Sequence, residues 1–121
     1  MSASNELESI MGIRLPEDYK EFINDFGYKV FENISLEVYG YKPSFDIGKL
    51  PCVVAATRMS QEDYSLKKNE IVISNNGYED FLVILDVETG DVYELNRSRL
   101  KNTLANSFSN WLSDLKKQNN S

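Results

Sequence analysis

The 121-residue sequence contains no histidine and a single cysteine, Cys52. The lack of histidine excludes imidazole acid–base catalysis, Ser-His and Cys-His nucleophile pairs, and histidine-ligated metals. One cysteine forms neither an internal disulfide nor a cysteine metal site, and it is typical of a reducing compartment. Glycine-rich phosphate loops and the GxSxG and HExxH motifs are also missing. We therefore expect that the protein is not an enzyme and needs no cofactor and no metal.

Long apolar runs and excess positive charge are missing as well. No stretch approaches the ~20 apolar residues that cross a bilayer, and the first residues lack the features of a signal peptide. We therefore expect a cytoplasmic protein without membrane contact. The 13 basic and 19 acidic residues give a net charge of −6. This charge disfavours direct nucleic-acid binding and favours a basic protein partner.

The length fits one domain, and its 41% hydrophobic and 26% charged residues are ordinary for a globular protein. We expect a single domain over residues 1–121, with its core in residues 6–115 and a frayed tail over 116–121. Residues 1–40 contain eight acidic and three basic side chains, so the negative charge belongs mainly to the N-terminal part.

Two helices are predicted near the N-terminus. The first begins at Asn5, with Glu8 completing a capping box, and ends at Gly12. The second begins at Pro16 and ends at Gly27. Its apolar residues recur with helical spacing, and acidic side chains fill the other face. The apolar stripe consists of Tyr19, Phe22, Ile23 and Phe26.

The remaining segments predict a sheet and two further helices. Alternation predicts a strand near residues 34–39, and short strands are expected at 71–73, 81–87 and 91–95. Residues 51–63 fit a helix or a strand, and we favour the helix because no turn signal interrupts them before Ser60. A last helix is expected over 106–117, with Phe108 and Trp111 in the core.

This order of elements predicts an α+β fold. Helices grouped apart from a hairpin meander indicate an antiparallel sheet. We expect about four strands, covered by the N-terminal, middle and C-terminal helices.

Three local groupings permit a chemical and a structural interpretation. Asp86, Glu88 and Asp91 surround one turn, which fits a divalent-cation site or an ordinary polar hairpin, and we favour the hairpin. Glu79 and Asp80 are adjacent in a loop, where their side chains should diverge. Cys52 lies at a predicted helix start, where a thiol can be activated, but free cysteines are more often buried apolar residues.

Several tyrosines fall outside the core periodicities, and tyrosine is enriched at protein interfaces. Partial burial at the sheet edge is the alternative. These tyrosines are Tyr28, Tyr39, Tyr41 and Tyr78. We combine three of them with the nearby acids into one candidate partner surface. It consists of Glu17, Asp18, Glu21, Asp25, Tyr39, Tyr41, Tyr78, Glu79 and Asp80.

Four segments carry a family resemblance. Residues 15–23 read LPEDYKEFI, 36–40 read LEVYG, and 107–112 read SFSNWL. Between them, residues 71–93 contain IVIS, then NG, LD, and finally GDVY. In this order the segments resemble the SUKH superfamily, the Smi/Knr-type domain, over roughly residues 6–115. Trp111 stands where that family usually has phenylalanine.

The resemblance implies helices on an antiparallel sheet and a non-catalytic function. Bacterial members are mostly immunity proteins of polymorphic toxin systems, which bind and block a cognate toxin domain that is often a nuclease. Fungal members are cell-wall and signalling scaffolds. The resemblance therefore implies an immunity protein whose partner is a toxin domain, with a regulatory scaffold as the alternative. We expect a monomer, with a weak dimer as the other possibility.

Overall fold

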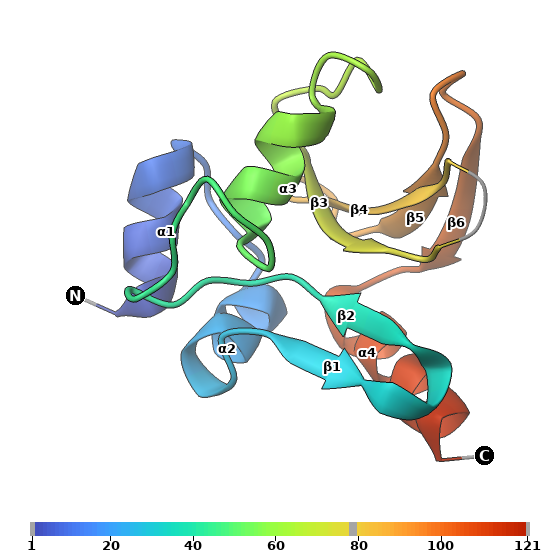
Figure 1. Cartoon of the computed structure of the whole chain (residues 1–121), viewed down its shortest axis with the longest axis horizontal. Coiled ribbons are helices and arrows are strands. Elements are labelled where there is room, and N and C mark those ends of the chain that lie inside the picture. The colour runs from blue at the N-terminus through green and yellow to red at the C-terminus, as the bar shows by residue number, and fades with distance from the viewer. Residues whose placement is uncertain (1, 78–79, 121) are drawn as a thin grey trace.

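The computed structural model describes residues 2–77 and 80–120, which form four α-helices and a six-stranded antiparallel sheet (Figure 1). The helices are α1 (Ala3–Met11), α2 (Glu17–Asp25), α3 (Val53–Ser60) and α4 (Phe108–Asn119). The strands are β1 (Lys29–Phe31), β2 (Leu36–Val38), β3 (Glu70–Asn75), β4 (Leu82–Asp86), β5 (Val92–Leu95) and β6 (Lys101–Ala105). The predicted α+β fold is confirmed, with six strands rather than about four.

The strands lie in the sheet in the same order as in the chain, and each pairs antiparallel with the next. The helix α3 connects β2 to β3 and packs against β3. The presence of α3 at Val53–Ser60 confirms the helical interpretation of residues 51–63. Within the described part of the chain, no helix is long and apolar enough to span a bilayer.

The two additional strands lack the apolar alternation that sequence reasoning requires. The strand expected near residues 34–39 is β2, and it forms a hairpin with the additional strand β1 through a short 3-10 turn, η1 (Glu32–Ile34). The strand β6 is exposed along most of its length and lies at the edge of the sheet. Its polar residues are held in a strand by pairing with β5 and not by burial of one face.

Helix ends follow the expected chemistry with small shifts in position. Ser2, and not Asn5, caps α1, because its hydroxyl oxygen accepts the Asn5 amide at 3.2 Å. Glu8 instead accepts the amide of Leu15 at 2.8 Å and so fixes the link between α1 and α2. Gly12 ends α1 with a φ of 67°.

The segment expected as a frayed tail, residues 116–121, contains the last turn of α4, which continues to Asn119. Asn119 accepts the Asn33 amide at 2.9 Å through its side chain, and its carbonyl accepts the Asn33 side-chain amide at 2.7 Å. These bonds attach the end of α4 to η1, so the last turn is held by tertiary contacts.

The helices α2 and α4 pack through a buried aromatic cluster. The rings of Tyr19 and Phe108 meet edge to face at 4.9 Å, and those of Phe22 and Phe108 at 5.2 Å. Trp111 extends the cluster, with its ring 5.9 Å from Phe108. Each pair contributes about 0.5–1.5 kcal/mol beyond the burial of its area. The expected core role of Phe108 and Trp111 is therefore confirmed.

A segment of three residues, Tyr39–Gly40–Tyr41, joins the two halves of the fold. The amide of Tyr39 donates to Ile73 of β3 at 2.7 Å, which continues the short β2–β3 pairing. The carbonyl of Gly40 accepts the amide of Val53 at 2.8 Å, at the start of α3. The amide of Tyr41 donates to the Gly27 carbonyl at 2.8 Å. Backbone hydrogen bonds therefore connect this junction to β3, α3 and the end of α2.

The backbone approach at Gly40 leaves no room for a side chain. A Cβ atom at this position would lie 1.6 Å from the Gly27 carbonyl oxygen. A backbone atom cannot move aside as a flexible side chain can. Gly40 is therefore required by the close contact between its own backbone and that of Gly27.

We predict that Gly40→Ala lowers the free energy of unfolding by at least about 3 kcal/mol, the upper end of overpacking costs. Urea unfolding followed by tryptophan fluorescence measures the change. Gly48→Ala is the matched control, because its nearest atom is the Asp46 Oδ1 at 3.3 Å and its neighbourhood is exposed. If the free energy of unfolding of Gly40→Ala is within about 1 kcal/mol of the parent value, the range of ordinary substitutions, the contact with Gly27 does not require glycine.

Candidate functional site

The four predicted acids of α2 divide into two groups. Glu17, Glu21 and Asp25 are exposed. Asp18 is partly buried, and its Oδ2 accepts both the amide and the hydroxyl of Ser109, at 2.9 and 2.8 Å. A carboxylate at this position stabilises the positive N-terminal end of α4. Asp18 therefore connects α2 to α4, and the other three acids face solvent.

Tyr39 and Tyr41, which we included in the candidate partner surface, are both buried, at 7% and 4% exposure. The carbonyl of Tyr39 accepts the phenol of Tyr19 at 2.8 Å, and the phenol of Tyr41 donates to Glu6 Oε1 at 3.1 Å. Burial raises the phenol pKa of both residues, with smaller contributions from Glu37 at Tyr39 and from Glu6 at Tyr41. Their rings belong to the core of the junction.

Of the remaining members of the predicted surface, only Asp80 is described, and it does not join the acids of α2. Tyr78 and Glu79 lie outside the described residues. The Asp80 carbonyl accepts the phenol of Tyr64, and its Oδ2 accepts the Arg97 amide at 3.1 Å. These contacts place Asp80 beside the loops that precede β3 and β6, whereas α2 packs against α1 and α4 (Figure 1). Tyr28, the fourth tyrosine, is half-buried against Phe45.

A groove between α2 and α4 contains two of the three exposed acids, Glu21 and Asp25, together with the partly buried Asp18. It has a volume of about 230 Å³. Phe22, Phe108 and Leu112 form its apolar part, and acids and Lys116 stand at its rim. Phe26, in the same groove, is 47% exposed although the helical spacing assigned it to the core. We call this the α2–α4 groove; its acidic members are Asp18, Glu21 and Asp25.

The charges around the α2–α4 groove are unequally neutralised. Lys20 lies 3.8 Å from carboxylate oxygens of both Glu8 and Glu17, which offsets part of their charge. Among the described residues, Glu21 and Asp25 have no ion pair. Lys29 lies over the exposed Phe26 ring, 5.0 Å from its centroid. The groove therefore combines two unpaired carboxylates with an accessible aromatic ring.

A second charged cluster is buried and serves the fold. Both carboxylate oxygens of Glu70 are engaged: Arg99 donates to them at 2.8 and 3.3 Å, and the phenol of Tyr93 donates to Oε2. Glu70 is 3% exposed. Lys101 covers the Tyr93 ring, with its amine 4.1 Å from the centroid. The cluster holds the loop before β6, where Arg99 adopts a φ of 67°, against β3 and β5.

The carboxyl groups at the β4–β5 turn also serve the backbone. Asp86 Oδ1 accepts the amides of Glu88 and Thr89, at 2.9 and 3.2 Å. Gly90 completes the turn with a φ of 86°. This arrangement confirms the hairpin interpretation of the segment. Within residues 2–77 and 80–120, no three acidic or cysteine side chains are grouped as metal ligands. Cys52 is fully buried at the start of α3.

Sequence reasoning identified the acids of the α2–α4 groove and missed its apolar part. Leu112 and Lys116 come from α4, and only the packing of α4 on α2 places them beside Glu21 and Asp25. The exposure of Phe26 was also missed, because it continues the apolar stripe of α2 by one further turn. Its position as the last residue of that stripe, just before Gly27, was the only available signal.

Comparison with known proteins identifies one family. A SUKH family model described as "SMI1-KNR4 cell-wall" matches residues 1–117. No curated protein matches the chain. The match covers all the helices and strands except the last residues of α4.

We predict that Glu70→Gln lowers the free energy of unfolding by about 3–5 kcal/mol, because it leaves the Arg99 guanidinium without its charged partner. Burial acts to raise the pKa of Glu70, but the hydrogen bonds from Arg99, Tyr93 and the Lys67 amide hold it below its ordinary 4.5. The contribution of the ionised group is therefore complete above that value and is lost as the pH falls through the lower folded pKa.

Urea unfolding of both proteins between neutral and acidic pH measures this dependence. The stability difference should shrink as the pH falls below the ordinary glutamate pKa. Glu62→Gln, at an exposed position before β3, is the control and should show a small, pH-independent difference. A difference for Glu70→Gln that grows toward acidic pH would contradict the assignment.

Proposed function

Because the chain belongs to the SMI1-KNR4 family of SUKH domains, we propose that it is an immunity protein that binds and blocks a cognate toxin domain. The observation that carries the proposal is the α2–α4 groove, where unpaired Glu21 and Asp25 stand beside the exposed ring of Phe26. Acids around an aromatic anchor suit a basic protein surface. A nuclease toxin has such a surface where it binds the phosphates of its substrate.

Inhibition in this proposal is steric and electrostatic. The carboxylates of Glu21 and Asp25 occupy positions that the substrate phosphates would take, and the bound domain then excludes the substrate. Negative charge on the inhibitor also speeds encounter with a basic cleft at low salt. Such a function requires affinity and a matching shape, and it requires no catalytic group on this chain.

The groove is the centre of the proposed interface and not its full extent. A standard protein interface covers about 800 Å² on each partner. The accessible surface of the chain is 6672 Å², so a toxin would cover roughly an eighth of it. We place Glu17, on the same helix, at the rim of this interface, where ion pairs contribute less than those that lose water.

A regulatory scaffold is the second candidate. The words "cell-wall" in the description of the matching family favour it. A scaffold would bind several cellular proteins and would have no toxin gene beside its own. The two candidates are therefore separated by the identity of the partner and not by the fold.

The first test is the DNA that flanks the gene. The proposal expects a neighbouring frame that encodes a secreted protein with a C-terminal toxin domain. Co-expression with that domain should restore growth, and the purified complex should lack toxin activity. Growth arrest despite a stable, expressed immunity chain would overturn the proposal. Recovery of several cell-wall proteins, with no toxin nearby, would support the scaffold instead.

We predict that Glu21→Lys combined with Asp25→Lys slows association with the toxin at least about tenfold at low salt, with a smaller effect at high salt. Stopped-flow or surface-plasmon measurements over a salt series give the rates. The matched control is Glu37→Lys with Glu62→Lys, which changes the net charge equally at exposed sites away from the groove. If both double variants slow association equally, the effect comes from net charge in general, and the assignment of the interface to the groove is wrong.

We predict that Phe26→Ala speeds dissociation of the toxin complex about tenfold or more, as expected when an interface aromatic is truncated. The ring is 47% exposed in the free chain and packs on Phe22 at 5.9 Å, so its loss should lower thermal stability only modestly and leave the chain folded. Leu100→Ala, which removes a side chain 56% exposed in the loop before β6, is the control. If the Phe26 variant dissociates no faster than the control, Phe26 is not the aromatic anchor of the interface.

A further inference from the structure

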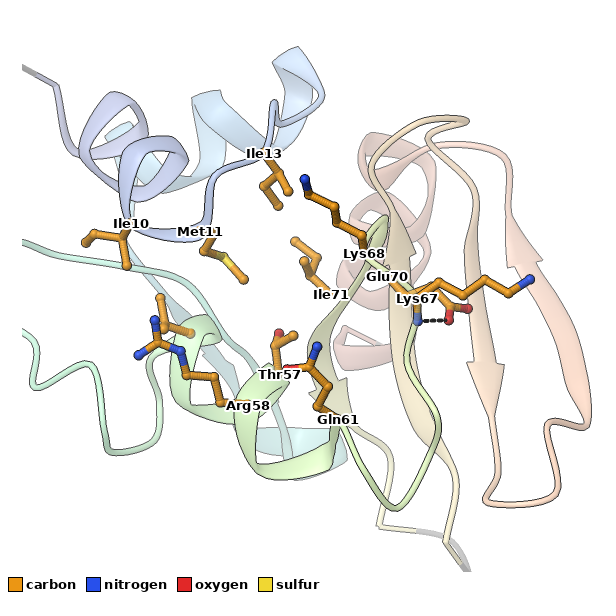
Figure 2. A pocket seen from close by; sticks show the side chains of 11 residues that line it. Ile10, Met11, Ile13, Thr57, Arg58, Gln61, Lys67, Lys68, Glu70 and Ile71 are labelled. Carbon is orange, nitrogen blue, oxygen red and sulfur yellow. Dashed lines mark hydrogen bonds between the residues drawn. The ribbon is translucent and has the colours of Figure 1, made fainter.

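A pocket lies between the end of α1, the segment after it, α3 and the start of β3 (Figure 2). Its volume is about 150 Å³. Figure 2 shows Met11 and Ile71 directed into it, with Ile10 and Ile13 along the α1 side. Thr57 of α3 lies opposite them. The interior is therefore mostly aliphatic.

The mouth of the pocket is basic, although the whole chain is acidic. Arg58 of α3 and Lys68 of the loop before β3 are exposed and lie on different sides of the pocket (Figure 2). Neither has an ion pair among the described residues. Glu70 also lines the pocket, but its carboxylate is held by Arg99 and Tyr93. Lys67 is the third cation of the lining, and Figure 2 shows its side chain directed away from the pocket. Arg58 and Lys68 are therefore the two cations that stand beside the aliphatic interior.

The size of the pocket indicates what it can hold. Binding sites for metabolites and drug-sized molecules usually measure about 300–1,000 Å³. A cavity near 150 Å³ accepts a group the size of benzene, which is one leucine or phenylalanine side chain.

The pocket continues into a shallower groove of about 450 Å³, with which it shares Ile13 and Lys68. This groove runs past Arg14 to Glu88 at the β4–β5 turn. A chain that leaves the pocket can follow it in an extended conformation. The arrangement suits a polypeptide anchored by one side chain better than a free small molecule.

We propose that this pocket binds an acidic segment of a partner protein, with one leucine- or phenylalanine-sized side chain inserted and flanking carboxylates held by Arg58 and Lys68. Arg14 is placed to meet a further carboxylate along the groove. The charge of the site is opposite to that of the α2–α4 groove, and the two share no residue. The inference therefore stands apart from the proposed toxin interface and names a second partner surface.

The test uses the full chain and a fluorescein-labelled peptide of sequence Glu-Asp-Leu-Glu-Asp, blocked at both ends. Fluorescence anisotropy should show saturable binding. Arg58→Glu with Lys68→Glu should weaken it at least about tenfold, because both charge contacts become repulsive. Exchange of the peptide leucine for alanine should weaken it about fivefold or more, as expected for an emptied apolar pocket.

The matched control is Lys49→Glu with Lys117→Glu, which makes the same change of net charge at exposed positions away from the pocket. It should retain binding within about twofold, the range of weak long-range charge effects. Both double variants alter exposed side chains, so circular dichroism and thermal unfolding should match those of the parent.

Three results would overturn the inference. The first is the absence of saturable peptide binding, and the second is equal weakening by both charge-reversal variants. The third is saturation of the same site by hexanoate with no gain from the peptide, which would assign the pocket to a small carboxylate. The Glu21 and Asp25 variants can lose toxin binding while peptide binding at the pocket is unchanged. The outcome of one test therefore does not decide the other proposal.

Discussion

The fold depends on the contact between the backbones of Gly40 and Gly27. Around it, Tyr39 and Tyr41 bring β3, α3 and the end of α2 within hydrogen-bonding distance of one short segment. The β1–β2 hairpin joins the rest of the sheet through the single paired position Val38–Ser74 and these few bonds. The glycine contact, together with the packing of α4 on α2, β1 and η1, holds the hairpin and α2 beside the larger sheet.

Elements with strong local signals were predictable from the sequence. Helical spacing and capping residues located α2 and α4, and the turn residues located the β3–β4–β5 meander. The strands β1 and β6 were not predictable, because their residues show little apolar alternation and depend on a paired neighbour. The tyrosines of the junction were misjudged for a related reason. Tyr39 and Tyr41 fall outside any regular period, yet a non-periodic segment can be buried when three elements converge on it.

The residues of the candidate sites were likewise predictable only where they lie close together in the sequence. The acids of α2 were found because they share one helix, whereas Leu112 and Lys116 reach the groove only through packing. Charged residues also differ in how they are used. Asp18 and Glu70 hold backbone or other side chains in place, and sequence alone gives no sign of this. Asp86 also holds backbone, and there the turn residues around it did predict the role. Two groups of charges without an ion pair among the described residues, Glu21 with Asp25 and Arg58 with Lys68, line the two surfaces where recognition is proposed.

The open edge of the sheet at β6 has a consequence for colloidal behaviour. An unpaired strand edge is a template on which another chain can add, and repeated addition leads to fibrils. Here the edge is short and polar, begins with Lys101, and is interrupted by a register shift opposite Val92 and Tyr93. A straight intermolecular ladder would have to bury the lysine and flatten that irregularity. The residues that made β6 hard to recognise as a strand are therefore of the kinds that discourage ordered aggregation at a sheet edge.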